Sequence, residues 1–278
     1  MSVLADGAGL PGLSHVITWF NDPSNWWGSS GLLIRIREHL LYALIILLIA
    51  IVIALPLGLF VGHTGRGVVV VVGLANGLRA IPTLGLVIYL YLWLSTKITT
   101  TFAVPWLVDR GALASFVSVM IALVLLALPP ILTSTYAGVQ NVDPAARDAA
   151  SGMGMTGAQV VRKVELPCAL PLIMSGIRSA ALQVIATVTV AAYLPFLGGL
   201  GRYIKDGAGD LNNTQTGYPA MVAAGLTVAI LAVVVDALFN LLQRALVSPG
   251  LTGRIKRDSR RTTVDRIDAP AEANLISA

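Results

Sequence analysis

The residues of this chain that could do chemistry are concentrated between positions 137 and 171. This segment contains Asp148-Ala149-Ala150, then Gly154, then Val164-Glu165-Leu166-Pro167. Small residues and a glycine around one carboxylate suit contact between proteins, because alanine adds little bulk to a helix face and glycine permits a sharp reversal. We therefore expect a protruding elbow that docks a partner; a loop that only covers the rest of the protein is the alternative.

Helix-capping signals divide this segment into two short helices. Asp143 followed by Pro144 is typical of a helix start, because proline at the first helical position loses no hydrogen bond. Thr156 with Gln159 three residues later is typical of a capping box. Glycines at positions 152, 154 and 157 separate the two helices. The second helix is predicted to stop before Pro167, which would direct the chain back toward the rest of the protein.

The composition around this segment is that of a membrane protein. The chain is 56% hydrophobic and 12% charged, whereas soluble domains are about 25% charged. Five long apolar runs account for the difference, and each exceeds the roughly 18 residues that indicate a transmembrane helix. The runs cover residues 40–61, 68–94, 112–136, 173–197 and 218–242. We predict an all-α integral membrane fold with five transmembrane helices, with Pro82 breaking or kinking the second and the third ending near Pro129-Pro130.

Metal, disulfide and nucleic-acid chemistry have no support in the sequence. His15, His39 and His63 are scattered, and Cys168 is the single cysteine, so we expect no metal site and no internal disulfide. The N-terminal 31 residues lack the pattern of a cleavable signal peptide. The net charge of +5 is better explained by membrane topology than by nucleic-acid binding.

Basic residues predict the orientation of the five spans. Eleven Lys and Arg residues lie in segments 62–67, 137–172 and 243–278, and six lie in the segments facing the other side. Because basic loops stay in the cytoplasm, the N-terminus is predicted outside and the C-terminus inside. Residues 1–38 then form an extracytoplasmic segment, and residues 39–250 form the transmembrane domain, with a cytoplasmic loop at 137–171. Residues 251–278 form a basic tail, interpreted as disordered and facing lipid, with a sensor of lipid charge as the alternative.

Charged residues within the spans form a second group of candidates. Arg79, Arg178 and Asp236 lie in apolar runs, where a charge is costly and is usually paired or functional. Arg178 and Asp236 are predicted at similar depth, and the favoured interpretation is a structural pair or snorkelling of the side chains to the membrane interface; a gating role is the alternative.

Tryptophans cluster before the first span, at positions 19, 26 and 27. Aromatic clusters can hold quaternary ammonium groups by cation–π attraction. Their position at a predicted membrane interface favours an aromatic belt instead. The same interpretation applies to Tyr89, Tyr91 and Trp93.

The spacing from Asp148 to Pro167 resembles the EAA motif of ABC importer permeases, which reads Glu-Ala-Ala, three residues, Gly, nine residues, Ile, one residue, Leu-Pro. This chain has Asp for Glu at position 148 and Val for Ile at position 164. The resemblance implies the fold of a type I ABC importer permease. It also implies that Asp148, Ala149, Ala150, Gly154, Val164, Leu166 and Pro167 couple the chain to a cytoplasmic ATPase.

Further segments narrow the resemblance to osmoprotectant importers, whose substrates are glycine betaine, choline, carnitine and proline. These segments are residues 62–66, 128–138, 142–144 and 152–156, and single matching positions in the second span are Asn76, Arg79, Ile81, Pro82 and Thr83. The resemblance covers roughly residues 32–250 and implies that the outer loop at Gly198, Gly199, Leu200 and Gly201 faces a binding protein. The chain departs at Pro195 and Phe196, where family members usually have small residues.

The expected function is therefore that of the membrane subunit of an ATP-driven importer in a bacterial cell membrane, with no catalysis of its own. The sequence contains no Gly-Lys dipeptide, so ATP and Mg²⁺ would be bound by a separate P-loop ATPase and this chain would bind no cofactor. Further expected partners are an extracytoplasmic binding protein, a second permease copy and the lipid bilayer. A methionine-type permease, an ion-coupled secondary transporter and a membrane scaffold or sensor are the alternatives.

Overall fold

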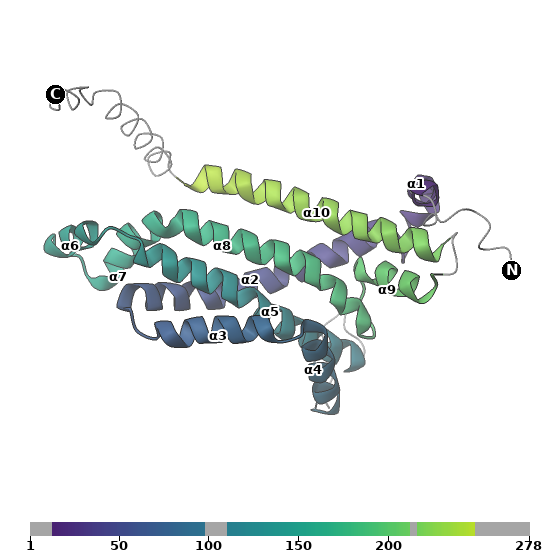
Figure 1. Ribbon diagram of the computed structural model, residues 1–278, viewed down its shortest axis with the longest axis horizontal. Helices are drawn as coiled ribbons and strands as arrows, with labels where there is room; N and C mark the ends of the chain where they lie inside the picture. The colour runs from purple at the N-terminus through teal and green to yellow at the C-terminus, as the bar shows by residue number, and fades with distance from the viewer. Residues whose placement is uncertain (1–12, 98–109, 212–215, 248–278) are drawn as a thin grey trace, which may run out of the picture.

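The computed structural model describes residues 13–97, 110–211 and 216–247, and the regular elements in these ranges are all helical (Figure 1). The predicted tail at 251–278 lies outside the described residues. The elements are α1 Leu13–Asn21, η1 Pro23–Asn25, α2 Leu32–Thr64, α3 Val68–Ala80, α4 Thr83–Lys97, α5 Arg110–Gln140, α6 Pro144–Gly152, α7 Gly157–Val160, η2 Val161–Glu165, α8 Leu166–Thr187, η3 Val188–Tyr193, α9 Gly201–Gly209 and α10 Gly217–Leu246.

Four described helices are long and apolar enough to cross a membrane, and α3 with α4 makes a fifth span if this bent pair is counted as one. The long helices run side by side, with α4 turned across their direction (Figure 1). This arrangement confirms the predicted all-α fold and the multi-pass membrane class. A helix is the expected spanning element, because lipid cannot satisfy backbone polar groups.

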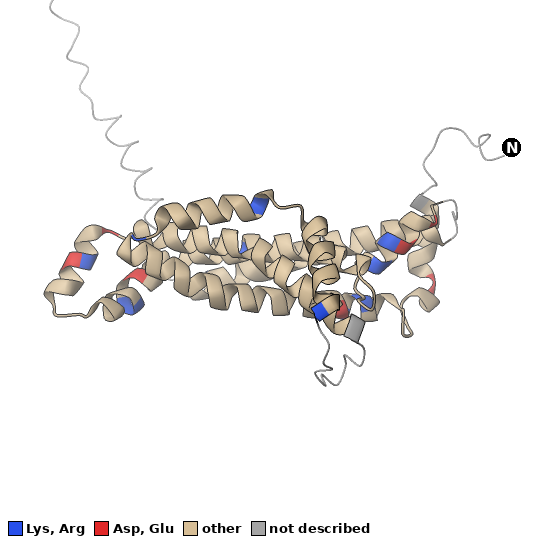
Figure 2. Ribbon diagram, turned by 90° about the horizontal axis from the view of Figure 1, so that it is seen from below, with Lys and Arg blue, Asp and Glu red and all other residues tan. Residues whose placement is uncertain are grey.

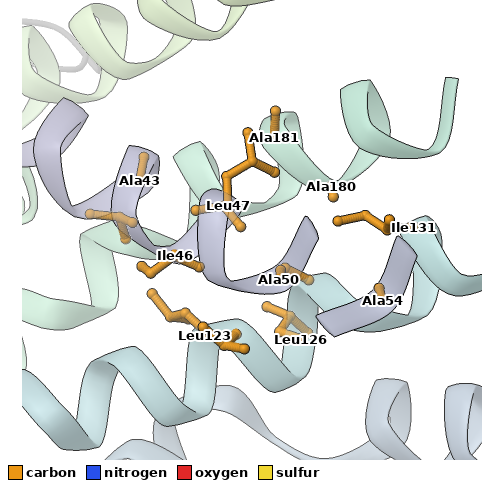
Figure 3. Packing of buried hydrophobic residues seen from close by; sticks show 14 of the residues in the cluster. Ala43, Ile46, Leu47, Ala50, Ala54, Leu123, Leu126, Ile131, Ala180 and Ala181 are labelled. Carbon is orange, nitrogen blue, oxygen red and sulfur yellow. The ribbon is translucent and has the colours of Figure 1, made fainter. Parts of the chain in front are cut away.

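The core of the bundle lies where α2, α5 and α8 meet. Small side chains line the contact, which lets the helix axes approach closely. Figure 3 shows Ile46 of α2 next to Leu123 of α5, and Ala50 of α2 next to Leu126 of α5. Glycines extend this close packing. A Cβ atom added to Gly58 would lie 2.6 Å from the Cβ of Thr135, and one added to Gly176 would lie 2.5 Å from the Cβ of Ser134.

The second span is broken, as Pro82 predicted. Helices α3 and α4 meet at an angle of 89°, and Ile81 between them has extended backbone angles. The residue before a proline is disfavoured in the helical region by steric clash, so the helix ends there. A Cβ atom added at Gly73 or Gly77 of α3 would meet no neighbouring element of the described chain within 4 Å, unlike one added at the glycines of the core.

The predicted end of the third span near Pro129-Pro130 is wrong. Helix α5 continues through both prolines to Gln140. The Thr133 hydroxyl donates to the Pro129 carbonyl at 2.7 Å. This helix lies at the centre of the bundle and packs against α2, α3, α4 and α8, so neighbouring helices support it where the two prolines would otherwise end it.

The fourth span both begins and ends earlier in the sequence than the predicted range, 173–197. Helix α8 begins at Leu166 and continues into η3, which ends at Tyr193. Leu194 then takes extended angles, with φ −88° and ψ 150°, because it precedes Pro195. Hydropathy extends past this point, but the helix cannot.

Two groups of short elements mark the ends of the bundle. We call the end that carries α6 and α7 the elbow end, and the end that carries α1, η1 and α9 the cap end (Figure 1). The described Lys, Arg, Asp and Glu residues gather at these two ends, with few along the middle (Figure 2). Helix α10 packs on α1, α8 and α9. The bundle therefore presents an apolar middle between two polar ends.

Candidate functional site

The elbow is built by the two capping signals that the sequence predicted. The Asp143 carboxylate accepts from the Ala145 N–H at 3.0 Å, and α6 begins at Pro144. The Gln159 side chain accepts from the Thr156 N–H at 2.8 Å, which completes the capping box of α7. Both helix starts are confirmed. Side chains satisfy N–H groups that a short helix leaves free.

Gly154 makes the reversal between α6 and α7. Its φ is +82°, in the left-handed region that costs a residue with a Cβ atom about 1–2 kcal/mol. The next residue, Met155, donates its N–H to the Ala150 carbonyl at 3.2 Å. This bond satisfies one of the carbonyls at the end of α6 and folds the chain back.

The exposed face of α6 is narrower than the sequence suggested. Asp148 and Ala149 are exposed, whereas Ala150 retains only 2% of its accessible surface. Two adjacent alanines point in directions about 100° apart on a helix, so they need not share a face. Ala149 is thus the alanine that a partner could touch. Ala150 packs inside the elbow.

The second helix of the elbow does not stop before Pro167, and that prediction is wrong. The chain passes from α7 through one π-helical turn, η2, directly into α8. The Leu166 N–H donates to the Val161 carbonyl, five residues back. A π turn widens the helix locally. This widening relieves the clash that a proline ring would make with the preceding turn.

Glu165 is a residue whose role the sequence did not predict. Its side chain is completely buried, at 0% exposure, although it is charged. The Glu165 carboxylate lies 3.0 Å from Nε of Arg147 and 2.9 Å from Nδ1 of His63. The motif spacing does not predict this contact, because the two partners of Glu165, Arg147 and His63, lie 18 and 102 residues away in the sequence.

Arg178 and Asp236 are brought together by α8 and α10. Arg178 donates from Nε and Nη2 to the two carboxylate oxygens, at 2.5 and 2.7 Å, and from Nη1 to the side-chain oxygen of Asn240 at 2.6 Å. Such two-pronged geometry is the strongest form of an Arg–carboxylate contact. Arg79 is not part of this group. It is exposed at the end of α3 and forms no ion pair within the described part of the chain.

The loop after η3 is anchored to the first span. The Gly199 N–H donates to Oε2 of Glu38 at 2.7 Å, and Arg35 donates to the same oxygen at 2.9 Å. Gly198, Gly199, Leu200 and Gly201 are all buried. Pro195 and Phe196 form the exposed part instead, and Phe196 is 58% exposed with a φ of +66°. The glycines let the loop sit against α2, and the two residues before them face outward.

The cap-end tryptophans lie in different environments. Trp19 is 7% exposed and packs edge-on against Phe20 and Tyr203, with ring centroids 5.6 Å apart in each pair. Trp27 is 71% exposed. Burial raises the pKa of the Tyr203 phenol, whose hydroxyl donates to the Ser30 carbonyl at 2.5 Å. This cluster is packed aromatic structure rather than an open cage.

One cavity of about 360 Å³ opens at the base of the elbow. Its lining comes from the end of α5 and the start of α8, and includes Asn141, Asp143 and Cys168. No three His, Cys, Asp or Glu side chains among the described residues are grouped as metal ligands.

Four long apolar helices and the bent α3–α4 pair, with a two-helix elbow at one end and an anchored loop at the other, define a multi-pass membrane protein. The model of the binding-protein-dependent transport system inner membrane component family matches residues 54–248, and the chain belongs to this family. Among curated proteins, it is 32% identical over 222 residues to the glycine betaine/carnitine/choline transport system permease protein OpuCB of Bacillus subtilis (strain 168), covering 80% of this chain and 91% of that protein. It is 30% identical to the osmoprotectant import permease protein OsmW of Salmonella typhimurium, covering 77% and 91%.

Solved structures support the same fold. An inward-facing structure of the MetNI methionine ABC transporter matches with a TM-score of 0.62 and 19% identity, covering 78% of this chain and 96% of that chain. At this level of sequence identity, the match is evidence for the fold but not for the function. The relatives with greater sequence similarity are osmoprotectant permeases, and the type I ABC importer permease fold is confirmed.

Proposed function

We propose that this permease imports osmoprotectants, meaning quaternary amines such as glycine betaine, choline and carnitine, or proline. Two relatives at 30% and 32% identity, each matched over most of its length, carry names from this substrate class. The substrate class follows from this similarity. The cap-end tryptophans offer no separate argument for quaternary amines, because Trp19 is packed against Phe20 and Tyr203 and Trp27 is exposed.

The mechanism rests on the elbow. Asp148 and Ala149 lie exposed on a short helix that protrudes beyond the spans (Figure 1). We infer that this helix sits in a cleft of a separate cytoplasmic ATPase, which binds ATP and Mg²⁺. Closure of two ATPase subunits would then move two elbows and switch the bundles between inward- and outward-facing states. The motif residues Gly154, Val164, Leu166 and Pro167 shape this elbow and its return to α8.

The positions of the elbow end and the cap end also support a proposal for the orientation of the chain in the membrane and for its outer partner. The elbow end is proposed to face the cytoplasm, in line with its basic residues, and the cap end to face outside. Pro195 and Phe196 would then contact an extracytoplasmic binding protein, with Gly198 to Gly201 holding the loop on α2. A second permease copy would complete the translocation path, because five spans form too small a wall alone.

The test is reconstitution of the chain in proteoliposomes with its ATPase and binding protein. ATPase stimulation and uptake are compared for glycine betaine, choline, carnitine, proline and methionine. Stimulation by one or more of the first four supports the proposal. Stimulation by methionine alone would assign the methionine alternative, and uptake that persists without the ATPase would indicate a secondary transporter.

A further inference from the structure

A buried carboxylate stands at the junction between the elbow and the bundle. Glu165 is the last residue of η2 and is fully buried. His63 is in the last turn of α2, and Nδ1 lies 3.0 and 2.9 Å from the two oxygens of Glu165. Arg147, in the middle of α6, places Nε 3.0 Å from Oε1. One carboxylate is therefore held by cationic or donor groups from two other helices.

Arg147 extends this contact to a fourth helix. Its Nη2 donates to the Val139 carbonyl near the end of α5. At the same place α5 lies tightly against α2, because a Cβ atom on Gly62 would be 2.6 Å from the Cβ of Val139. The side chains of His63, Glu165 and Arg147 thus connect the elbow-end termini of α2, α5 and α8 to the centre of α6. We call these three residues the elbow joint.

The backbone alone would hold α6 loosely. On one side a short non-helical link from Asn141 to Asp143 joins it to α5, and on the other the Gly154 turn joins it to α7. Helices joined by such links are free to change their angle unless side chains fix it. A buried charge fixes it well, because moving its partner away leaves an unsatisfied charge in a low-dielectric place.

We propose that Glu165 is a positioning residue that locks α6 to α2, α5 and α8, so that movement of the elbow is delivered to these three spans together. This inference rests on the proposed function, since it assigns a path for the force that the ATPase would apply. Helices α3, α4 and α10 have no residue in the joint. These helices are attached to the core by other contacts. Under this proposal α2, α5 and α8 move directly with the elbow, and the remaining helices move only through their contacts with those three.

The first test measures substrate transported per ATP hydrolysed in proteoliposomes. Glu165→Gln removes the charge and keeps the size. His63→Ala removes one partner at a side chain that is 33% exposed, so folding is retained. His63→Asn restores a donor near the position of Nδ1. Arg66→Met is the matched control, because Arg66 is exposed in the turn after α2 and its loss removes a charge outside the joint.

We expect Glu165→Gln and His63→Ala to lower the transport-to-ATP ratio about fivefold or more, the size of a typical coupling between sites. ATP hydrolysis should persist, His63→Asn should recover most of the ratio, and Arg66→Met should match the parent chain. An unchanged ratio in both Glu165→Gln and His63→Ala would overturn the proposal. So would equal losses in His63→Ala and Arg66→Met.

The second test measures movement directly. Spin labels are placed at Ser151→Cys in α6 and Thr64→Cys in α2, both exposed positions, in a Cys168→Ser background. In the parent complex the distance between the labels should stay the same with and without ATP. In His63→Ala it should change or broaden when ATP binds. A distance that changes with ATP in the parent complex would show that elbow and bundle do not move as one body.

These outcomes separate the two proposals. If the chain forms no complex with an ATPase, the proposed function fails. If the complex forms and transports while the joint variants keep both the ratio and the label distance, only the joint fails.

Discussion

Arg178 on α8 holds Asp236 on α10 through two hydrogen bonds of 2.5 and 2.7 Å, across 58 positions of sequence. Helix α10 is otherwise lightly packed, with only 11% of its most apolar window buried. This ion pair, extended by Asn240, is therefore a main polar attachment of the last span. Its loss should affect the position of α10 more than the core.

Removing only one partner of this pair should destabilise the protein more than removing both partners. Arg178→Met leaves Asp236 unpaired and should destabilise the protein by about 1–3 kcal/mol, less than a fully buried pair would cost, because the two side chains are 33% and 28% exposed. The double variant Arg178→Met with Asp236→Leu should be more stable than Arg178→Met alone. Thermal unfolding in detergent measures both. Equal stability of the single and double variants would contradict a structural pair and favour a gating role.

Gly154→Ala should weaken coupling through backbone strain alone. A Cβ atom at Gly154 meets nothing within 4 Å, but its φ is +82°, so the expected cost is about 1–2 kcal/mol in the elbow turn. Substrate-stimulated ATPase activity should fall. Gly152→Ala is the matched control, since it also meets nothing within 4 Å and lies in α6 without a positive φ. Equal effects of the two variants would show that the turn conformation is not what matters.

Ala149 and Ala150 should respond differently to added bulk. Ala149→Leu places a large side chain on the exposed face of α6, so the chain should fold normally and bind the ATPase less tightly. Ala150→Leu forces the same side chain into a position that is 2% exposed, so it should lower thermal stability by about 1–3 kcal/mol. ATPase pull-down and thermal unfolding separate the two effects. Normal ATPase binding by Ala149→Leu would place the docking face elsewhere.

Gly176→Ala should destabilise the core. The added Cβ atom would lie 2.5 Å from the Cβ of Ser134 and 2.7 Å from the Pro130 carbonyl oxygen, so α5 and α8 must separate, at a cost of about 1–3 kcal/mol. Gly225→Ala in α10 is the control, because nothing lies within 4 Å of its added Cβ atom. That control should be neutral or slightly stabilising, since alanine favours helix. The unfolding temperature should therefore fall for Gly176→Ala and stay the same or rise for Gly225→Ala; an equal fall in both would contradict the close packing at Gly176.

Phe196→Gly should stabilise the outer loop and weaken the stimulation of ATPase activity by the binding protein. Glycine relieves the strain of φ +66°, a gain of about 1 kcal/mol, while removing an aromatic side chain that is 58% exposed. If the loop contacts the binding protein, its stimulation of ATPase activity should fall while the activity without it stays constant. Unchanged stimulation would remove Phe196 from the proposed outer interface.

The sequence by itself was enough for the class of protein, the approximate positions of the spans and the starts of the two elbow helices. Long apolar runs demand helices in lipid, and capping residues such as Asp143 and Thr156 act within one helical turn, so their effect is readable from neighbouring positions. The break in the second span could be predicted in the same way, from Pro82. These features depend on local chemistry or on composition.

Only the tertiary structure decided which residues share a contact. Pro129 and Pro167 stay inside continuous helices because surrounding helices and a π turn accommodate them, against their local preference. Ala150 is buried and Ala149 exposed because of how α6 lies on its neighbours. Glu165 meets His63 across 102 positions, and no pattern of spacing encodes that meeting. Side-chain contacts between distant segments follow from packing of the whole bundle, and therefore from the fold rather than from any single stretch of sequence.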